Sequence, residues 1–226
     1  MRALLLVAVL FVAACASNGT VSPGQLAKTD IDRVVDAHHR AVFASLKVLA
    51  EKLYRRNPRQ WRKAGLTGED AAIARLFDPA TAWHLPELDG RYGTDAVLAS
   101  LGQDYSGDRV AAFIGGLGGM LNDAFNDKTD FYVFDELDPQ KLHNAARNLE
   151  IAAWKLANAH AADGSPLLLS NEMQPVRNLS FEREFGKMIG NLDLLSDIVA
   201  DKTNRSVIKV IQSMASAVFL PVAGIK

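Results

Sequence analysis

The sequence predicts an all-α fold, an irregular bundle of four to five long helices with shorter helices between them. Long stretches repeat apolar residues at spacings of three and four, which is the period of a helix with one buried face. No segment alternates apolar and polar residues over the length of a strand. With 226 residues and 49% hydrophobic content, the chain is long enough to bury one sizeable core.

The chain begins with an apolar segment that we exclude from the folded domain. Arg2 is followed by an uncharged run from Ala3 to Val12 and then by small residues. A helix of this run is about 15 Å long, too short for a hydrocarbon core of ~30 Å. Residues 1–14 are therefore predicted to be a signal peptide.

The residues Val12-Ala13-Ala14-Cys15 resemble the lipobox of bacterial lipoproteins, an aliphatic residue and two small residues before a cysteine. The resemblance implies that Cys15, the only cysteine, receives a diacylglycerol, and that the signal is cut before it and the new amine is acylated, usually with palmitate. Since Ala16 rather than Asp follows the cysteine, it also implies attachment to the outer membrane, facing the periplasm. The alternative is an ordinary secretory signal with a cysteine near its cleavage site.

A flexible tether and a single helical domain are expected after the lipidated cysteine. Residues 15–28 are small, polar and turn-forming, and the domain is predicted to span residues 29–226. Its first helix is expected over 30–56. The apolar stripe of that helix consists of Ile31, Val35, His38, Val42, Leu46, Leu49 and Leu53.

Shorter elements are predicted in the middle of the domain. Asn57-Pro58 ends the first helix and starts a short one that stops near Gly65. Another short helix runs toward Leu76, and the Pro- and Gly-containing residues 78–93 form a loop. Two further helices are expected over 94–102 and 108–126.

Three helices are predicted in the last part of the chain. Asp138-Pro139 starts one whose apolar stripe extends to His160, and a second carries its stripe from Phe181 to Val199. After Asn204, Val207, Ile211, Met214 and Val218 repeat the same spacing and predict a final helix ending near Leu220. Residues 131–134 and 167–169 are short enough to be strands or packed connectors.

Neither composition nor motifs indicate catalysis. The net charge of −1 is far from the strongly basic balance expected of a nucleic-acid binder, so we expect no nucleic-acid partner. Ser206 and Lys209 match the S-x-x-K string, in which a lysine activates a serine on the next helical turn, but the companion K-T-G and S-D-N strings are missing. Hydrolysis of a cell-wall substrate by this pair is the weakest hypothesis, and we expect a non-enzymatic protein without a cofactor.

The sequence also lacks a recognisable metal-binding pattern. Its five histidines form no H-x-x-x-H or H-E-x-x-H motif. His38 and His39 point about 100° apart on a helix, so they cannot both face one ion, and we expect His38 on the apolar stripe to be a core or boundary residue. The acid-rich stretch 122–138 lacks the spacing of a calcium-binding EF-hand and is predicted to be a solvated loop.

A basic stretch, residues 52–63, carries six cations and no acidic residue. Three interpretations remain open: a surface for anionic lipid head groups or acidic cell-wall polymer, an intramolecular partner for residues 123–138, or a solvated helix end stabilised by the helix dipole. The candidate interaction surface comprises Lys52, Arg55, Arg56, Arg59, Trp61, Arg62 and Lys63.

Residues 110–121 form an uncharged segment with four glycines, Gly115, Gly116, Gly118 and Gly119. Four glycines cost a helix about 4 kcal/mol relative to alanine, so close approach of another helix is expected to compensate. The alternative is that this glycine face contacts a membrane, an apolar ligand or another copy of the chain. At about 18 Å the segment cannot span a bilayer.

Two functional hypotheses follow from these observations. The leading one is an envelope lipoprotein, tethered to the outer membrane by its lipid anchor, whose helical domain binds another protein, a lipid or a cell-wall component. The alternative is a periplasm-facing carrier of an apolar, lipid-like ligand. Its cleft would lie between the glycine-rich helix and the predicted final helix over 204–220.

Overall fold

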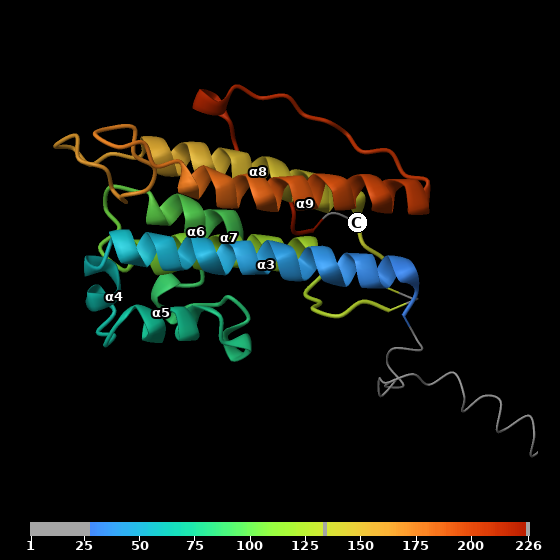
Figure 1. The fold of residues 1–226 in the computed structure, drawn as a ribbon, viewed down its shortest axis with the longest axis horizontal. Helices are drawn as coiled ribbons and strands as arrows, with labels where there is room; N and C mark the ends of the chain where they lie inside the picture. The colour runs from blue at the N-terminus through green and yellow to red at the C-terminus, as the bar shows by residue number, and fades with distance from the viewer. Residues whose placement is uncertain (1–27, 133–134, 225–226) are drawn as a thin grey trace, which may run out of the picture.

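Helices make up the regular structure of the domain, as predicted (Figure 1). The computed structural model describes residues 28–132 and 135–224, and within these ranges no strand is formed. Residues 167–169 are part of an irregular segment rather than a strand. The predicted signal peptide, Cys15 and nearly all of the predicted tether lie outside the described residues.

Helix α3 (Asp30–Arg56) is the long first helix that the apolar stripe predicts. Thr29 caps its N-terminus, because the Thr29 hydroxyl accepts a hydrogen bond from the Asp32 amide while the Asp32 carboxylate accepts one from the Thr29 amide. Such a reciprocal box satisfies two amides that a helix start leaves unpaired. Lys28 forms ion pairs with Asp36 and Asp130, which fixes the point where the chain enters the domain.

Two antiparallel helices form a layer against α3. Helix α8 (Pro139–Asn158) packs along α9 (Ser180–Thr203), and α9 packs along α3 (Figure 1). Helix α8 begins as predicted, with the Asp138 carboxylate accepting a hydrogen bond from the Gln140 amide at 2.8 Å. It ends at Asn158, so His160 lies beyond the helix instead of on its stripe.

The middle of the chain forms the other side of the domain. It contains α4 (Arg59–Lys63), α5 (Glu69–Leu76), the short 3-10 helices η1 (Pro79–Thr81) and η2 (Pro86–Leu88), α6 (Gly93–Ser100) and α7 (Arg109–Ala124). Helix α7 is in contact with α3, α4, α5, α6 and α8. Every residue from 109 to 121 is buried, which makes α7 the centre of the core.

The predicted final helix after Asn204 is wrong. Residues 205–224 form an extended strap that returns along α8 and contains only the 3-10 turn η3 (Met214–Ser216) within this stretch (Figure 1). Backbone groups of the strap pair with amide side chains of α8: Gln140 with Ile208, and Asn148 with Leu220. These hydrogen bonds replace those of a helix, and Ile211, placed on the predicted stripe, is 98% exposed.

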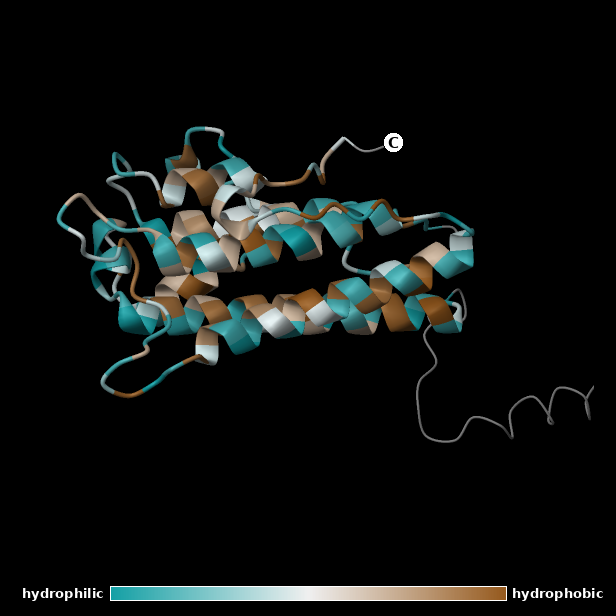
Figure 2. Ribbon diagram, turned by 90° about the horizontal axis from the view of Figure 1, so that it is seen from above, coloured by the Kyte–Doolittle hydropathy of each residue, from teal (hydrophilic) through white to brown (hydrophobic). Residues whose placement is uncertain are grey.

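None of the helices in the described ranges is long and apolar enough to cross a membrane. Hydrophilic and hydrophobic residues are mixed along the long helices in Figure 2. This distribution matches helices that bury one face in a shared core.

Candidate functional site

A pocket lined by aromatic rings lies between α3, residues 77–92 and residues 122–129. Its volume is about 550 Å³, within the range of small-molecule binding sites. We call it the aromatic pocket. Its ring-bearing residues are His39, Phe43, Phe77, Trp83, His84 and Tyr92.

The rings hold one another in place through direct contacts. The centroid of the Trp83 ring lies 5.7 Å from that of Phe43 and 5.3 Å from that of Phe77, the latter pair meeting edge to face. His84 stacks on Tyr92 with 4.4 Å between centroids. Aromatic pairs at these separations contribute about 0.5–1.5 kcal/mol beyond their buried area. The pocket wall is therefore largely organised before any ligand enters.

Helix α7 provides the surface on which this wall rests. A Cβ atom on Gly118 would lie 2.1 Å from the Trp83 ring, and one on Gly119 would lie 2.8 Å from the Tyr92 ring. Both positions must therefore be glycine for the two rings to lie against the helix. The Tyr92 hydroxyl also lies 3.1 Å from the Gly119 carbonyl oxygen and donates a hydrogen bond to it.

The other two glycines of the segment serve packing rather than the pocket. A Cβ atom on Gly116 would lie 2.7 Å from the backbone of α6, at the Gly93 oxygen and the Val97 nitrogen. One on Gly115 would meet the end of the Leu85 side chain at 2.8 Å. The glycine face thus has two parts. Gly116 allows close contact with α6, and Gly118 and Gly119 form a surface on which the aromatic rings pack.

The loop that carries Trp83 has a backbone conformation that L-residues rarely adopt. Ala82 and Trp83 both have positive φ, 43° and 64°. Each such residue costs roughly 1–2 kcal/mol. Side-chain hydrogen bonds oppose this cost: the Asp78 carboxylate accepts one from the Ala80 amide at 2.9 Å, and the Thr81 hydroxyl donates one to the Asp78 carbonyl at 2.9 Å. The loop aims the indole at α7 and into the pocket wall.

His39 contributes a buried polar group to the pocket. Its side chain is 8% exposed in a ring cluster with Phe43 and Phe125, and its Nε2 has no hydrogen-bond partner among the described residues. Burial lowers the pKa of His39, although the charge of nearby Asp36 partly opposes this effect. The imidazole is therefore mainly neutral at pH 7. A buried ring nitrogen without a hydrogen bond destabilises the folded state.

The rim of the pocket is acidic. Asp127 accepts a hydrogen bond from the Asn122 amide at 2.5 Å, and Asp123 lies 3.4 Å from the Tyr92 hydroxyl. Burial raises the pKa of Asp123, and the charge of Asp127 adds to that rise. Burial, together with the charge of Asp123, raises the pKa of Tyr92 to about 12, so its hydroxyl stays protonated as a donor.

His38 is half-buried, which agrees with the expected core or boundary position, and adjacent His39 is the more buried of the pair and faces the pocket. Another expectation about this region is wrong. The expected ligand cleft between the glycine-rich helix and a final helix does not form, because residues 205–224 are not helical. Trp83 and Tyr92 were not identified from the sequence, since their partners on α7 are distant in the chain.

The basic stretch 52–63 does not present one continuous set of free cations. Arg55 pairs with Glu69 at 3.0 Å, and Arg56 pairs with Glu172 at 2.6 Å, so these partners are not the acidic residues 123–138. The remaining members have different environments. Lys52 lies over the Phe181 ring, Arg62 lies over the ring of the half-buried Trp61, Lys63 donates to the Gly107 carbonyl, and Arg59 is exposed.

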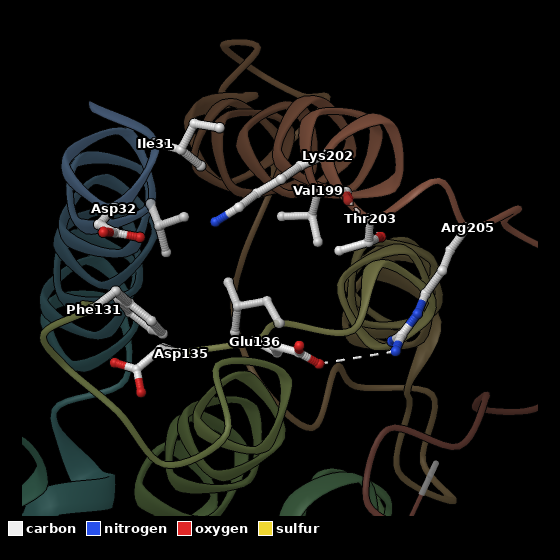
Figure 3. A pocket seen from close by; sticks show the side chains of 11 residues that line it. Ile31, Asp32, Phe131, Asp135, Glu136, Val199, Lys202, Thr203 and Arg205 are labelled. Atoms are coloured by element: carbon white, nitrogen blue, oxygen red, sulfur yellow. Dashed lines mark hydrogen bonds and ion pairs between the residues drawn. The ribbon is translucent and has the colours of Figure 1, made fainter. Parts of the chain in front are cut away.

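A second, smaller pocket lies where the chain enters the domain (Figure 3). It has a volume of about 310 Å³ and is bounded by the start of α3, the end of α9, Phe131 and residues 135–137. Lys202, Glu136 and Arg205 carry charges in its lining. The Arg205 guanidinium lies 4.0 Å from the Glu136 carboxylate. These three side chains are exposed to solvent, which weakens any selection by charge.

The described residues provide no support for the other chemical motifs. Ser206 and Lys209 are exposed in the strap, where no helical turn brings the lysine beside the serine. Within the described ranges, no group of three or more His, Cys, Asp or Glu side chains is placed to hold a metal ion.

No family model, curated protein or solved structure matches this chain.

The packing of Trp83 on Gly118 predicts that a glycine-to-alanine substitution has opposite effects on stability at two helical positions. Gly118→Ala should lower the free energy of unfolding by about 1–3 kcal/mol, because the new methyl group displaces the Trp83 ring. Gly186→Ala on α9 should raise it by about 0.5–1 kcal/mol, because its Cβ atom meets nothing within 4 Å and alanine favours the helix. Chemical denaturation measures both. Equal stability of the two variants would show that Trp83 does not rest on Gly118.

The pKa of His39 predicts how stability changes with pH. Its folded-state pKa lies below the ordinary 6.5, so the unfolded chain takes up the proton first as the pH falls. The stabilisation from the neutral ring is therefore complete above about pH 6.5 and is lost as the pH falls below that value. His39→Gln should reduce the loss of unfolding free energy between pH 7 and 5. The matched control is exposed His160→Gln, and the interpretation fails if both variants keep the parental slope.

Proposed function

We propose that this chain is a lipoprotein of the cell envelope, anchored to the outer membrane through Cys15 and facing the periplasm, whose helical domain binds a small apolar ligand. The lipobox resemblance of residues 12–15 supports the anchor. The aromatic pocket, whose rings are held by direct contacts with one another, is the observation that carries the binding role.

The size and lining of the pocket set the kind of ligand. A volume of about 550 Å³ suits a small molecule, and small-molecule sites are mostly apolar with a few polar groups that fix orientation. Here Phe43, Phe77 and Trp83 supply the apolar wall, while the hydrogen-bonded Asn122–Asp127 pair supplies polar groups. An apolar ligand would therefore occupy the aromatic pocket rather than a cleft beside residues 204–220.

The chain between the proposed anchor at Cys15 and the start of the domain limits how far the pocket can lie from the membrane. Thirteen peptide links separate Cys15 from Lys28, and a fully extended chain spans at most ~3.6 Å per residue, or roughly 45 Å in all. A domain held within that distance of a bilayer meets molecules that partition to the membrane surface. Two or more acyl chains on Cys15 would make this attachment stable, since each buried methylene contributes about 0.8 kcal/mol.

The anchor predicts the fate of a single substitution. Cys15→Ala should move the protein from the membrane fraction to the periplasmic fraction, because the acyl chains can no longer be attached. Fractionation with immunoblotting, and mass analysis of the native N-terminus, measure this. Membrane retention of the variant after a salt wash, or an unmodified native cysteine, would contradict the anchor.

The pocket predicts saturable binding of an apolar dye by the full chain purified in mild detergent. N-phenyl-1-naphthylamine should bind at one site per chain, and Trp83→Leu should weaken it about three- to tenfold through loss of ring contacts. Trp154→Leu is the matched control, since Trp154 is half-buried on α8 and does not line the pocket. Dye that only partitions into micelles would respond to neither variant, and that result would contradict a binding role for the pocket.

A further inference from the structure

We propose that the aromatic pocket selects organic cations, specifically a protonated amine carried on an apolar ring. This inference rests on the proposed function, because it names the ligand class of the same site. The ring would lie against Phe43, Phe77 and Trp83, and the ammonium group would lie at the rim beside Asp127.

The charges that line the pocket all have one sign. Asp78 and Asp127 line it, and no Lys or Arg is among its lining residues within the described ranges. Asp78 is partly engaged, because its carboxylate caps the turn at Ala80. Among the described residues, the Asp127 carboxylate accepts its hydrogen bond from the uncharged side-chain amide of Asn122.

Neither of the two lysines closest in sequence to Asp127 forms an ion pair with it in the described part of the chain. Lys128, its neighbour in the chain, forms an ion pair with Asp135. Lys141 donates a hydrogen bond to the uncharged Asn126 side chain at 2.9 Å, and its charge acts on Asp123. Within the part of the chain that the structure covers, Asp127 therefore has no ion-pair partner. Its charge is available to a ligand.

The backbone holds this carboxylate in an unusual conformation. Asp127 has a φ of 58° and follows Asn126, whose φ is 54°. The left-handed backbone conformation costs free energy for residues other than glycine, and here two successive residues adopt it. The Asn126 amide side chain donates to the Glu136 carbonyl at 2.8 Å, which fixes the turn. The turn therefore maintains Asp127 at the pocket rim.

The aromatic wall favours the same sign of ligand charge. Ring faces carry negative potential and attract an ammonium group within about 6 Å, an interaction of about 0.5–1 kcal/mol at exposed sites and more when desolvated. Burial lowers the pKa of His39, which lines the pocket, so this imidazole does not add a positive charge that would repel an ammonium group. An anionic ligand would meet two carboxylates and the negative ring faces without a lining cation.

Three probes of similar shape test the selection. 2-Phenylethylamine is a cation at pH 7, 2-phenylethanol is its neutral analogue, and phenylacetate is an anion. Isothermal titration of the full chain in mild detergent should show the amine binding at least fivefold more tightly than the alcohol, with phenylacetate the weakest.

Asp127→Asn separates charge from shape. Asparagine tolerates a left-handed φ and can still accept the Asn122 hydrogen bond, so the variant removes the charge and little else. Amine affinity should fall about three- to fivefold, as expected for a partly exposed charge, while alcohol affinity stays unchanged. Asp197→Asn on the exposed side of α9 is the matched control. Because the micelles are the same for each variant, detergent partitioning cancels.

The outcomes separate this inference from the proposed function. Equal binding of amine and alcohol, preference for phenylacetate, or no effect of Asp127→Asn would overturn the selection for cations. If the naphthylamine dye still binds with its dependence on Trp83, the binding role of the pocket stands in each of these cases. If the dye also fails to bind, both proposals fall together.

Discussion

The burial of α7 on every side is the constraint on which the rest of the structure depends. Five other helices contact it, and its residues from 109 to 121 are all buried. If ordinary side chains surrounded a helix on every side, the axes of neighbouring helices would lie about 8–10 Å from its own axis. Glycines remove that spacing on one side, so that α6 and the rings of the 77–92 segment can lie directly on the α7 backbone.

Stability and ligand binding therefore share the same residues. The Trp83 ring fills the space above Gly118 and also forms part of the pocket wall. Tyr92 precedes α6, covers Gly119 and stacks on His84. Because these rings are fixed by the core, the entropy cost of ordering them is met during folding rather than on binding. A pocket built in this way has a wall held in place by the core and carboxylates at its rim.

The sequence was sufficient to predict the all-α class and most of the long helices. Their amphipathic stripes and the Asp138 cap are local signals, which the structure confirms. The predicted final helix failed because Ile211 and its apolar neighbours repeat at helical spacing without a core to cover them. The strap instead lies along one face of α8. The side-chain amides of Gln140, Asn144 and Asn148 on that face donate hydrogen bonds to backbone oxygens of the strap. That partnership joins residues about 70 positions apart and leaves no periodic signal.

The candidate site was only partly accessible from the sequence. The glycine face could be recognised, because four glycines in one helix require compensation, but the rings that cover it come from a loop with positive φ at Ala82 and Trp83. Alanine and tryptophan give no local indication of that conformation, since glycine or asparagine is usual there. The proposed lipid anchor is the reverse case. Its signal is local to residues 12–15, and it lies outside the described part of the chain.

The encasement of α7 also determines how the domain can open. Water reaches the backbone amides of this helix only when the surrounding helices separate, since no turn between residues 109 and 121 faces solvent. Partial openings at the strap or at the 163–178 segment leave those amides covered. Deuterium should therefore enter α7 only through global unfolding, so this helix reports the stability of the whole cooperative unit.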